Sequence, residues 1–164
     1  MRALGAKRVL PVILPSDSTP ENDVRDAKAL AGRLGLLALV SNIEPALDSF
    51  GQLSEGRLSR ANLSARVRMA ILYSIAQREN GLVVGTGDKS EFALGYFTKH
   101  GDGGADLFPI GGLYKTEVKK LGSFLKLPAS ILSKPPSPAL WKGQTAESEL
   151  GFSYEEADAI IAGV

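Results

Sequence analysis

The glycine-rich stretch 81–106, GLVVGTGDKSEFALGYFTKHGDGGAD, concentrates side chains that can do chemistry. Asp88 and Glu91 are carboxylates of the kind that hold a hard cation such as Mg²⁺. Hydroxyl, basic and acidic groups follow within the same stretch: Thr98, Lys99, His100 and Asp106. This density favours a binding site for a ligand and its metal. Glycine turns and solvated loop charges are also common, so the pattern alone leaves both interpretations open.

An apolar run precedes these groups and ends in a small-residue turn. Leu82-Val83-Val84 is followed by Gly85-Thr86-Gly87. Such a run predicts the carboxyl end of a buried parallel strand. Open α/β sheets bind their ligands at that end. We therefore expect the polar groups behind the turn to share one cleft.

The composition limits the classes of protein to consider. The chain has 164 residues, enough for one domain with a core, and a net charge of +1. That charge gives no general attraction to nucleic acid or membranes. The absence of cysteine and the single histidine, His100, exclude a disulfide framework and a multi-histidine zinc site. The start MRALGAKRV lacks a signal-peptide core, so a soluble, cytoplasmic protein is expected.

Alternating apolar runs and helical patterns predict a parallel-sheet α/β domain. The expected strands are 9–14, 36–43 and 82–84. The expected helices are 20–34, 45–50, 63–78, 91–97, 115–127 and 154–162. Thr19 and Asn62 are the predicted N-caps of two of these helices, and Ser153 with Glu156 forms a predicted capping box.

Three basic residues stand at or near predicted helix starts. Arg66 and Arg68 would lie in early turns, where the helix dipole disfavours positive charge. They are therefore either solvated or directed at an anion. Lys115 follows Gly111-Gly112 and opens a helix, an arrangement that recurs in phosphate binding.

Five sequence segments carry a resemblance to a known family. They are GTGDKSE, GYFTKHGDGGAD, FPIGGLYKTEV, KPPSPALW and GQTAESELGFSYEEAD, in this order. Together they resemble the NH₃-dependent NAD synthetase family and the matching domain of glutamine-dependent NAD synthetases. The resemblance implies a Rossmann-like parallel sheet with flanking helices, of the adenine nucleotide alpha hydrolase-like type. It also implies that ATP adenylates the carboxylate of deamido-NAD and that ammonia then attacks the activated carbonyl.

The resemblance further implies roles for individual residues. The implied ATP contacts are Thr86, Lys115 and Ser137. The implied deamido-NAD contacts are Arg66, Lys99 and Asp106. Glu91 matches a Mg²⁺ ligand, no residue is implied as a general acid or base, and Asp88 is open between a loop carboxylate and a functional role. A homodimer through helices near 62–78 is also implied. The sequence contains no glutaminase domain, so the nitrogen donor is open between free ammonia and a separate partner.

Two family segments have no counterpart in this sequence. The pyrophosphate-binding sequence Ser-Gly-Gly-x-Asp-Ser does not occur in it. The start resembles the end of the helix after that loop, so we expect the first central strand, between 9–14 and 82–85, to be missing. A family His-Lys pair should lie beyond Val164. The expectation is a single truncated synthetase-type domain, 1–164, with little or no activity alone.

A missing central strand would leave backbone groups unpaired, which is costly when they are buried. Three accounts are open: a misplaced gene start or shortened chain, pairing of the two flanking strands with each other, or a strand supplied by another chain. Two functions are also open. The chain is an NAD synthetase-type amide ligase, or a non-catalytic nucleotide-binding or partner protein that keeps the substrate half of the site. A GMP-synthetase-like enzyme is disfavoured by GYFTKHGDGGAD.

Overall fold

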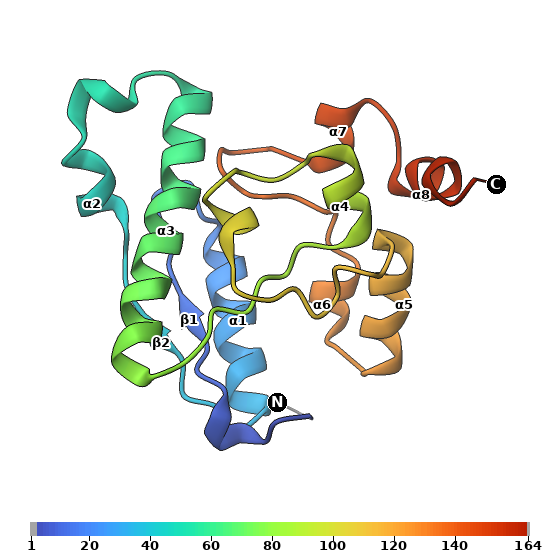
Figure 1. The fold of residues 1–164 in the computed structure, drawn as a ribbon, viewed down its shortest axis with the longest axis horizontal. Coiled ribbons are helices and arrows are strands. Elements are labelled where there is room, and N and C mark those ends of the chain that lie inside the picture. The colour runs from blue at the N-terminus through green and yellow to red at the C-terminus, as the bar shows by residue number, and fades with distance from the viewer. Residues whose placement is uncertain (1–2, 164) are drawn as a thin grey trace.

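Helices make up most of the computed structural model, which describes residues 3–163 (Figure 1). The α-helices are α1 (Glu21–Arg33), α2 (Glu44–Asp48), α3 (Arg57–Glu79), α4 (Lys89–Leu94), α5 (Lys115–Phe124), α6 (Ala129–Leu132), α7 (Ala146–Leu150) and α8 (Tyr154–Ala162). Short 3₁₀ turns cover Ala6–Arg8, Gly51–Ser54 and Asp102–Gly104. The strands are β1 (Val12–Ile13) and β2 (Leu39–Val40). The α/β class predicted from the sequence is confirmed, with a small sheet and many helices.

The strands pair in two separate places. β1 and β2 are parallel, with Val12 opposite Leu39, and α1 connects them. Val84 forms a parallel bridge with Leu107. Within residues 3–163, the two predicted flanking strands therefore each pair with another segment and not with each other. The account in which the two flanking strands pair with each other therefore does not hold in this structure.

The start of α1 differs from the prediction by one residue. Pro20, not Thr19, is the N-cap, and it makes no side-chain capping bond. The Thr19 hydroxyl instead accepts a hydrogen bond from the Ser16 amide at 3.0 Å, which closes the loop after β1. At its other end α1 stops before Gly35, whose φ of 69° is the left-handed conformation that glycine permits.

Helix α3 begins six residues before the predicted start at residue 63. Gly56 is its N-cap, and the predicted cap Asn62 lies inside the helix, where its amide oxygen accepts from the Thr98 hydroxyl at 2.8 Å. The polar sequence 57–62 lacks the apolar spacing that marks a helix, which explains the error. Arg66 and Arg68 consequently lie beyond the first turn, so the dipole argument for these two residues does not apply.

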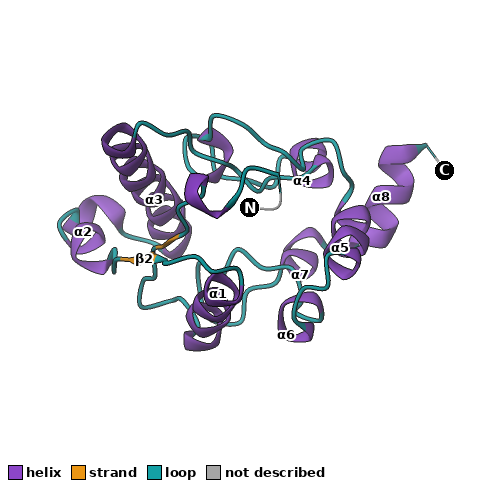
Figure 2. Ribbon diagram, turned by 90° about the horizontal axis from the view of Figure 1, so that it is seen from below, coloured by secondary structure: helices purple, strands orange, loops and turns teal. Residues whose placement is uncertain are grey.

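The predicted starts of the last long helices are confirmed. α5 begins at Lys115, and α8 spans Tyr154–Ala162 after the Ser153–Glu156 capping box. In Figure 2, α2 and α3 lie at one end of the molecule, and α4, α5 and α8 lie at the other. Among residues 3–163, none of the helices combines the length and the apolar character that crossing a bilayer requires.

The buried apolar core lies at the α3 end. Leu14 after β1 packs with Ile43, the N-cap of α2, and with Leu47 inside α2. Partly buried residues of β1 and α3 cover this cluster: Val12, Leu63, Val67, Ile71 and Leu72. The core therefore fixes the carboxyl end of β1 against α3, while the other end of the molecule combines buried apolar residues of α8 with the packed rings of Phe92 and Phe108.

Candidate functional site

Residues 83–85 lie beside residues 106–107, where Val84 bridges Leu107, and lead into a glycine turn. The Gly85 amide donates to the Leu107 carbonyl at 2.8 Å, and the Asp106 amide donates to the Val83 carbonyl at 3.0 Å. A Cβ added to Gly85 would lie 2.3 Å from the Phe108 ring. The close packing of this ring requires glycine at the turn, and it directs the following residues toward α4.

A capping box fixes two carboxylates at the start of α4. One oxygen of Asp88 accepts from the Glu91 amide at 2.9 Å, and one oxygen of Glu91 accepts from the Asp88 amide at 3.1 Å. The Asp-x-x-Glu spacing forms this reciprocal pair because the first amides of a helix lack partners within it. Each carboxylate keeps one oxygen for a further contact.

Lys115, the first residue of α5, supplies that contact. Its Nζ lies 2.5 Å from Asp88 Oδ2 and 2.6 Å from Glu91 Oε1. Asp88 is fully buried, whereas the side chains of Lys115 and Glu91 are 14% and 23% exposed. Buried charges are tolerated when they are paired and hydrogen-bonded, so the three groups form one preassembled cluster.

The surroundings shift the pKa values of this cluster. Burial raises the pKa of Glu91, although Lys115 opposes that shift. Burial alone would lower the pKa of Lys115, but its hydrogen bonds with Asp88 and Glu91 outweigh burial and raise it. Lys115 therefore stays charged at neutral pH.

Helix α8 supports the cluster from behind. Ser90 hydrogen-bonds to Asp158, and its hydroxyl also accepts from the Lys115 amide at 2.9 Å. Asp158 accepts from the Thr116 amide at 2.9 Å as well. Burial alone would raise the pKa of Asp158, but the hydrogen bonds from Ser90 and Thr116 outweigh burial and lower it. Asp158 thus joins the starts of α4 and α5.

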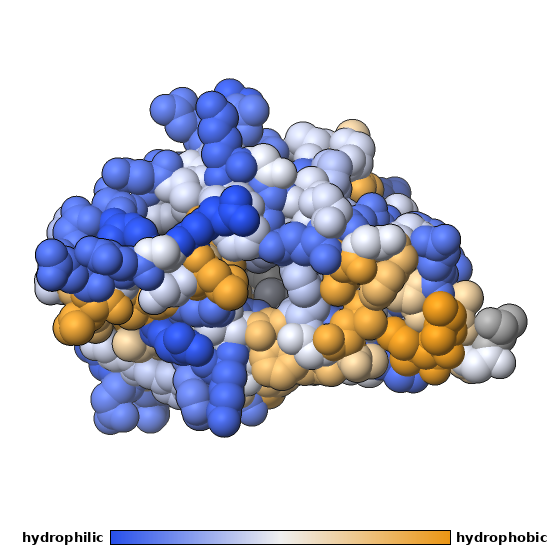
Figure 3. Space-filling view, turned by 90° about the horizontal axis from the view of Figure 1, so that it is seen from above, coloured by the Kyte–Doolittle hydropathy of each residue, from blue (hydrophilic) through white to orange (hydrophobic). Residues whose placement is uncertain are grey.

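A cavity of about 860 Å³ opens beside this cluster. Its walls include the end of β1, parts of α3 and α4, the segment 136–146 and Tyr154. Figure 3 shows a hollow between the two ends of the molecule. The predicted residues that line the cavity are Thr86, Glu91, Lys115 and Ser137. Ser137 is held in place because its hydroxyl donates to the Gln144 carbonyl at 2.6 Å.

The other three predicted residues lie outside the cavity lining. Arg66 donates from Nε to the Lys99 carbonyl at 3.1 Å. Asp106 accepts from the Tyr73 hydroxyl at 3.0 Å and from the Val83 amide at 2.7 Å. These exposed residues gather along the outer side of α3. The single cleft expected from the sequence is therefore divided into a cavity and an α3 face, the latter being Arg66, Lys99 and Asp106.

Two further residues line the cavity: Arg68, which the sequence left open between solvation and an anion, and Tyr154, which was not singled out. Arg68 donates from Nε to the Leu14 carbonyl at 2.9 Å, and burial lowers its pKa. Tyr154 is 1% exposed, and its hydroxyl has no hydrogen-bond partner among the described residues. Its ring centroid lies 5.1 Å from Lys115 Nζ. No spacing rule identifies Tyr154 as a neighbour of Lys115, since the two residues are distant in sequence.

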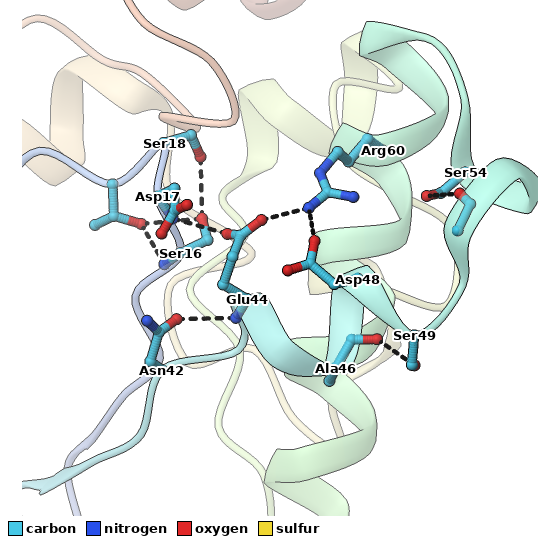
Figure 4. A network of polar contacts seen from close by, with 12 residues as sticks. Ser16, Asp17, Ser18, Asn42, Glu44, Ala46, Asp48, Ser49, Ser54 and Arg60 are labelled. Carbon is cyan, nitrogen blue, oxygen red and sulfur yellow. Dashed lines mark hydrogen bonds and ion pairs between the residues drawn. The ribbon is translucent and has the colours of Figure 1, made fainter.

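A polar network holds the loop after β1, which borders the cavity (Figure 4). Glu44 at the start of α2 accepts from the Asp17 amide at 2.8 Å and pairs with Arg60 of α3. Arg60 also lies 2.7 Å from Asp48. The network links β1, α2 and α3, so the loop is fixed without a ligand.

Oxygen donors for Mg²⁺ are few at this site. Within the part of the chain that the structure describes, no group of three or more acidic, histidine or cysteine side chains could hold a metal ion. Two carboxylates nevertheless converge on one cation, the Lys115 ammonium. Mg²⁺ in nucleotide sites is bound by one or two carboxylates, with phosphate and water oxygens completing its shell. Glu91 fits such a site, because it faces the cavity.

Comparisons with known proteins agree on one family. A family model described as NAD synthase matches residues 1–164. The chain is 51% identical to an NH₃-dependent NAD⁺ synthetase of Hyperthermus butylicus over 98% of its own length and 60% of the relative's. It resembles the structure of NMN synthetase from Francisella tularensis, with a TM-score of 0.90 and 41% identity over 94% of this chain and 66% of that one.

A Campylobacter jejuni NH₃-dependent NAD synthetase structure also matches, with a TM-score of 0.80 and 33% identity. The match covers 99% of this chain and 66% of that chain. The chain spans about 60% of the length of the Hyperthermus butylicus synthetase that it matches.

Proposed function

The chain belongs to the NAD synthase family, and from that premise we propose that it serves the ATP-dependent amidation of deamido-NAD by ammonia to give NAD. In this reaction ATP adenylates the nicotinic acid carboxylate, and ammonia displaces AMP from the activated carbonyl. The observation that carries the proposal is the convergence of Glu91 and Lys115 at one cavity wall. A carboxylate and an ammonium at one place suit a phosphate chain with its metal.

The cavity residues take the ATP side of this proposal. Lys115 is the first residue of the ten-residue helix α5, where its charge and the helix dipole both favour phosphate. Thr86 at the glycine turn and Ser137 in the segment 136–146 both line the cavity and offer hydroxyl groups to the nucleotide. Glu91 and phosphate oxygens would hold Mg²⁺, which neutralises negative charge on the phosphates when it is bound.

The chemistry needs charge compensation more than proton transfer. Adenylation brings a carboxylate and a triphosphate together, so positive groups must offset the repulsion between two anions. Lys115 is buried enough for its charge to act strongly and is already oriented by Asp88 and Glu91. No general acid or base is assigned among the cavity residues.

The α3 face takes the deamido-NAD side. Arg66 and Lys99 supply positive charge, and Asp106 supplies hydrogen-bond acceptors for ribose hydroxyls. These residues are exposed on the outer side of α3 in a single copy. We propose that a second copy covers this face and that the chain works as a homodimer in the cytoplasm, which measurement of the molecular mass in solution tests.

Binding and turnover should be measured separately. Calorimetric titration with ATP and Mg²⁺, and with deamido-NAD, tests the two halves of the site. Release of pyrophosphate and formation of NAD test the reaction. Because the sequence contains no Ser-Gly-Gly-x-Asp-Ser, we expect little turnover from these 164 residues alone. Binding of deamido-NAD with little turnover is therefore expected under both functions, appreciable formation of NAD would favour the ligase over the non-catalytic protein, and binding of neither ligand would contradict both.

One observation favours a second substrate. The match to a protein titled NMN synthetase has a TM-score of 0.90. The mononucleotide of nicotinic acid carries the same carboxylate and would leave the contacts for the second nucleotide unused. Titration of the protein with the mononucleotide and with deamido-NAD, under the same conditions, decides between them by the ratio of the two affinities.

A further inference from the structure

Asp88 and Glu91 hold the same ammonium in different environments. Asp88 is fully buried and does not line the cavity, whereas Glu91 is partly exposed and does. A ligand in the cavity can therefore reach Glu91 and Lys115 but not Asp88. The two ion pairs of Lys115 are unequal for this reason.

Asp88 is fixed more firmly than its position in a loop suggests. Its Oδ1 accepts from the Glu91 amide and caps α4, so the side chain cannot turn without releasing the helix start. Its Oδ2 has no hydrogen-bond partner among the described residues apart from the ion pair with Lys115 at 2.5 Å. A buried carboxylate oxygen with one cationic partner loses much stability if that partner leaves.

Lys115 is also fixed at its backbone. Its amide donates to the Ser90 hydroxyl at 2.9 Å, and Ser90 lies between Asp88 and Glu91 in α4. The centroid of the buried Tyr154 ring lies 5.1 Å from the ammonium. The ammonium is thus confined to the edge of the cavity, with Glu91 as its exchangeable partner.

We propose that Asp88 is a positioning residue that anchors the Lys115 ammonium at the cavity edge, which leaves Glu91 free to exchange Lys115 for a cation brought by the ligand. The anchoring follows from the contacts of this chain alone. Its consequence for a phosphate ligand rests on the proposed function. Asp88 does not touch the ligand and acts only through Lys115.

The test compares Asp88→Asn with Glu91→Gln. Asparagine still caps a helix start, so the first variant removes the charge and keeps the cap. Both variants are treated with an acylating reagent, and modification of Lys115 and of Lys119 is followed by mass spectrometry. Lys119 lies on the same helix, pairs with Glu155 at the surface and serves as the internal control. Asp48→Asn, which alters the exposed ion pair with Arg60, is the matched control variant.

Anchoring predicts that Asp88→Asn raises the modification rate of Lys115 several-fold and leaves Lys119 unchanged. Glu91→Gln should raise the Lys115 rate less than Asp88→Asn does, and Asp48→Asn should leave it close to its original value. Circular dichroism and thermal melting of each variant establish that it is folded. An unchanged Lys115 rate in Asp88→Asn, or an equal rise in Glu91→Gln, would overturn the proposal.

Calorimetry separates this proposal from the proposed function. If both hold, Asp88→Asn weakens binding of ATP with Mg²⁺ by about tenfold, the factor that corresponds to about 1.4 kcal/mol for one charge-assisted contact. If Lys115 becomes reactive in Asp88→Asn but the original protein binds no ATP, anchoring stands and the proposed function fails. If ATP binds equally to both proteins, the consequence proposed for the ligand fails.

Discussion

The cavity corner and the α3 face carry charged groups of the same kinds but hold them differently. At the corner, Asp88, Glu91 and Lys115 contact one another directly and are largely shielded from water. On the α3 face, Arg66 and Asp106 contact backbone groups or a tyrosine, and their side chains meet solvent. The corner is preassembled, whereas the face presents groups with remaining hydrogen-bonding capacity.

The difference follows from the cost of burying charge. A charge buried inside a folded protein must be paired with good geometry, so its partners are built into the fold. An exposed charge costs little without a partner, so a ligand or a second copy can supply one. We infer that changes at the corner affect stability and binding together, while changes on the face affect binding alone.

The largest expected effect is that of Lys115→Met. It leaves Asp88 fully buried without its cation, and removal of one member of a buried pair costs about 3–5 kcal/mol. Urea unfolding measures this loss. The matched control is Lys119→Met on the same helix, whose pair with Glu155 is exposed and should contribute less than about 1 kcal/mol. Equal losses in the two variants would remove the distinction between corner and surface.

Asp158→Asn tests the support behind the corner. The pKa of Asp158 is lowered in the folded protein, so its stabilisation is present above its ordinary value of 3.8 and is lost as the pH falls through the lowered folded value. Loss of a charged hydrogen-bond partner should cost about 1.5–3 kcal/mol at neutral pH. Unfolding at pH 7 and near pH 3 should show the difference between variant and original shrinking in acid. A difference that grows in acid would contradict this assignment.

Gly85→Ala tests the packing at the turn that leads into the corner. The added Cβ would meet the Phe108 ring at 2.3 Å and the Ala105 side chain at 2.9 Å, so the ring must move. Such overpacking costs roughly 1–3 kcal/mol. Gly112→Ala is the control, because nothing lies within 4 Å of its added Cβ. Thermal melting of both variants checks this prediction, which fails if they melt alike.

The smallest expected change in stability is that of Arg66→Gln on the α3 face. Substitutions of exposed residues away from special contacts stay within about 0.5 kcal/mol. The same variant should lose about tenfold in affinity for deamido-NAD, as removal of a charged contact of about 1.4 kcal/mol implies. Calorimetry with deamido-NAD and, separately, with ATP measures this. Weakened ATP binding with unaltered deamido-NAD binding would reverse the proposed roles of the two regions.

Local sequence signals predicted much of this arrangement. Lys115 after two glycines, and the Ser153–Glu156 spacing, identified the starts of α5 and α8 because helix starts are set by short-range contacts. The start of α3 was wrong because 57–62 is polar and its helix depends on contacts made later in the chain, such as Asn62 with Thr98.

The sequence did not predict which of the site residues lie together in space. Glu91 and Lys115 are 24 residues apart, and only the joining of α4, α5 and α8 through Asp158 brings their side chains together. The sequence left Asp88 open between a loop carboxylate and a functional role, and only the structure shows that it is fully buried against Lys115. Pairing partners distant in the chain leave no periodic signal, so their roles required the structure.

The central claim is that the cavity corner binds a nucleoside triphosphate with its metal through Glu91 and Lys115. Calorimetric titration of ATP into the original protein and Glu91→Gln, each with Mg²⁺ and with a chelator, tests it most directly. The account predicts that Mg²⁺ strengthens ATP binding to the original protein and gives no such gain in Glu91→Gln. Equal gains in both proteins, or no binding of ATP to the original protein, would contradict it.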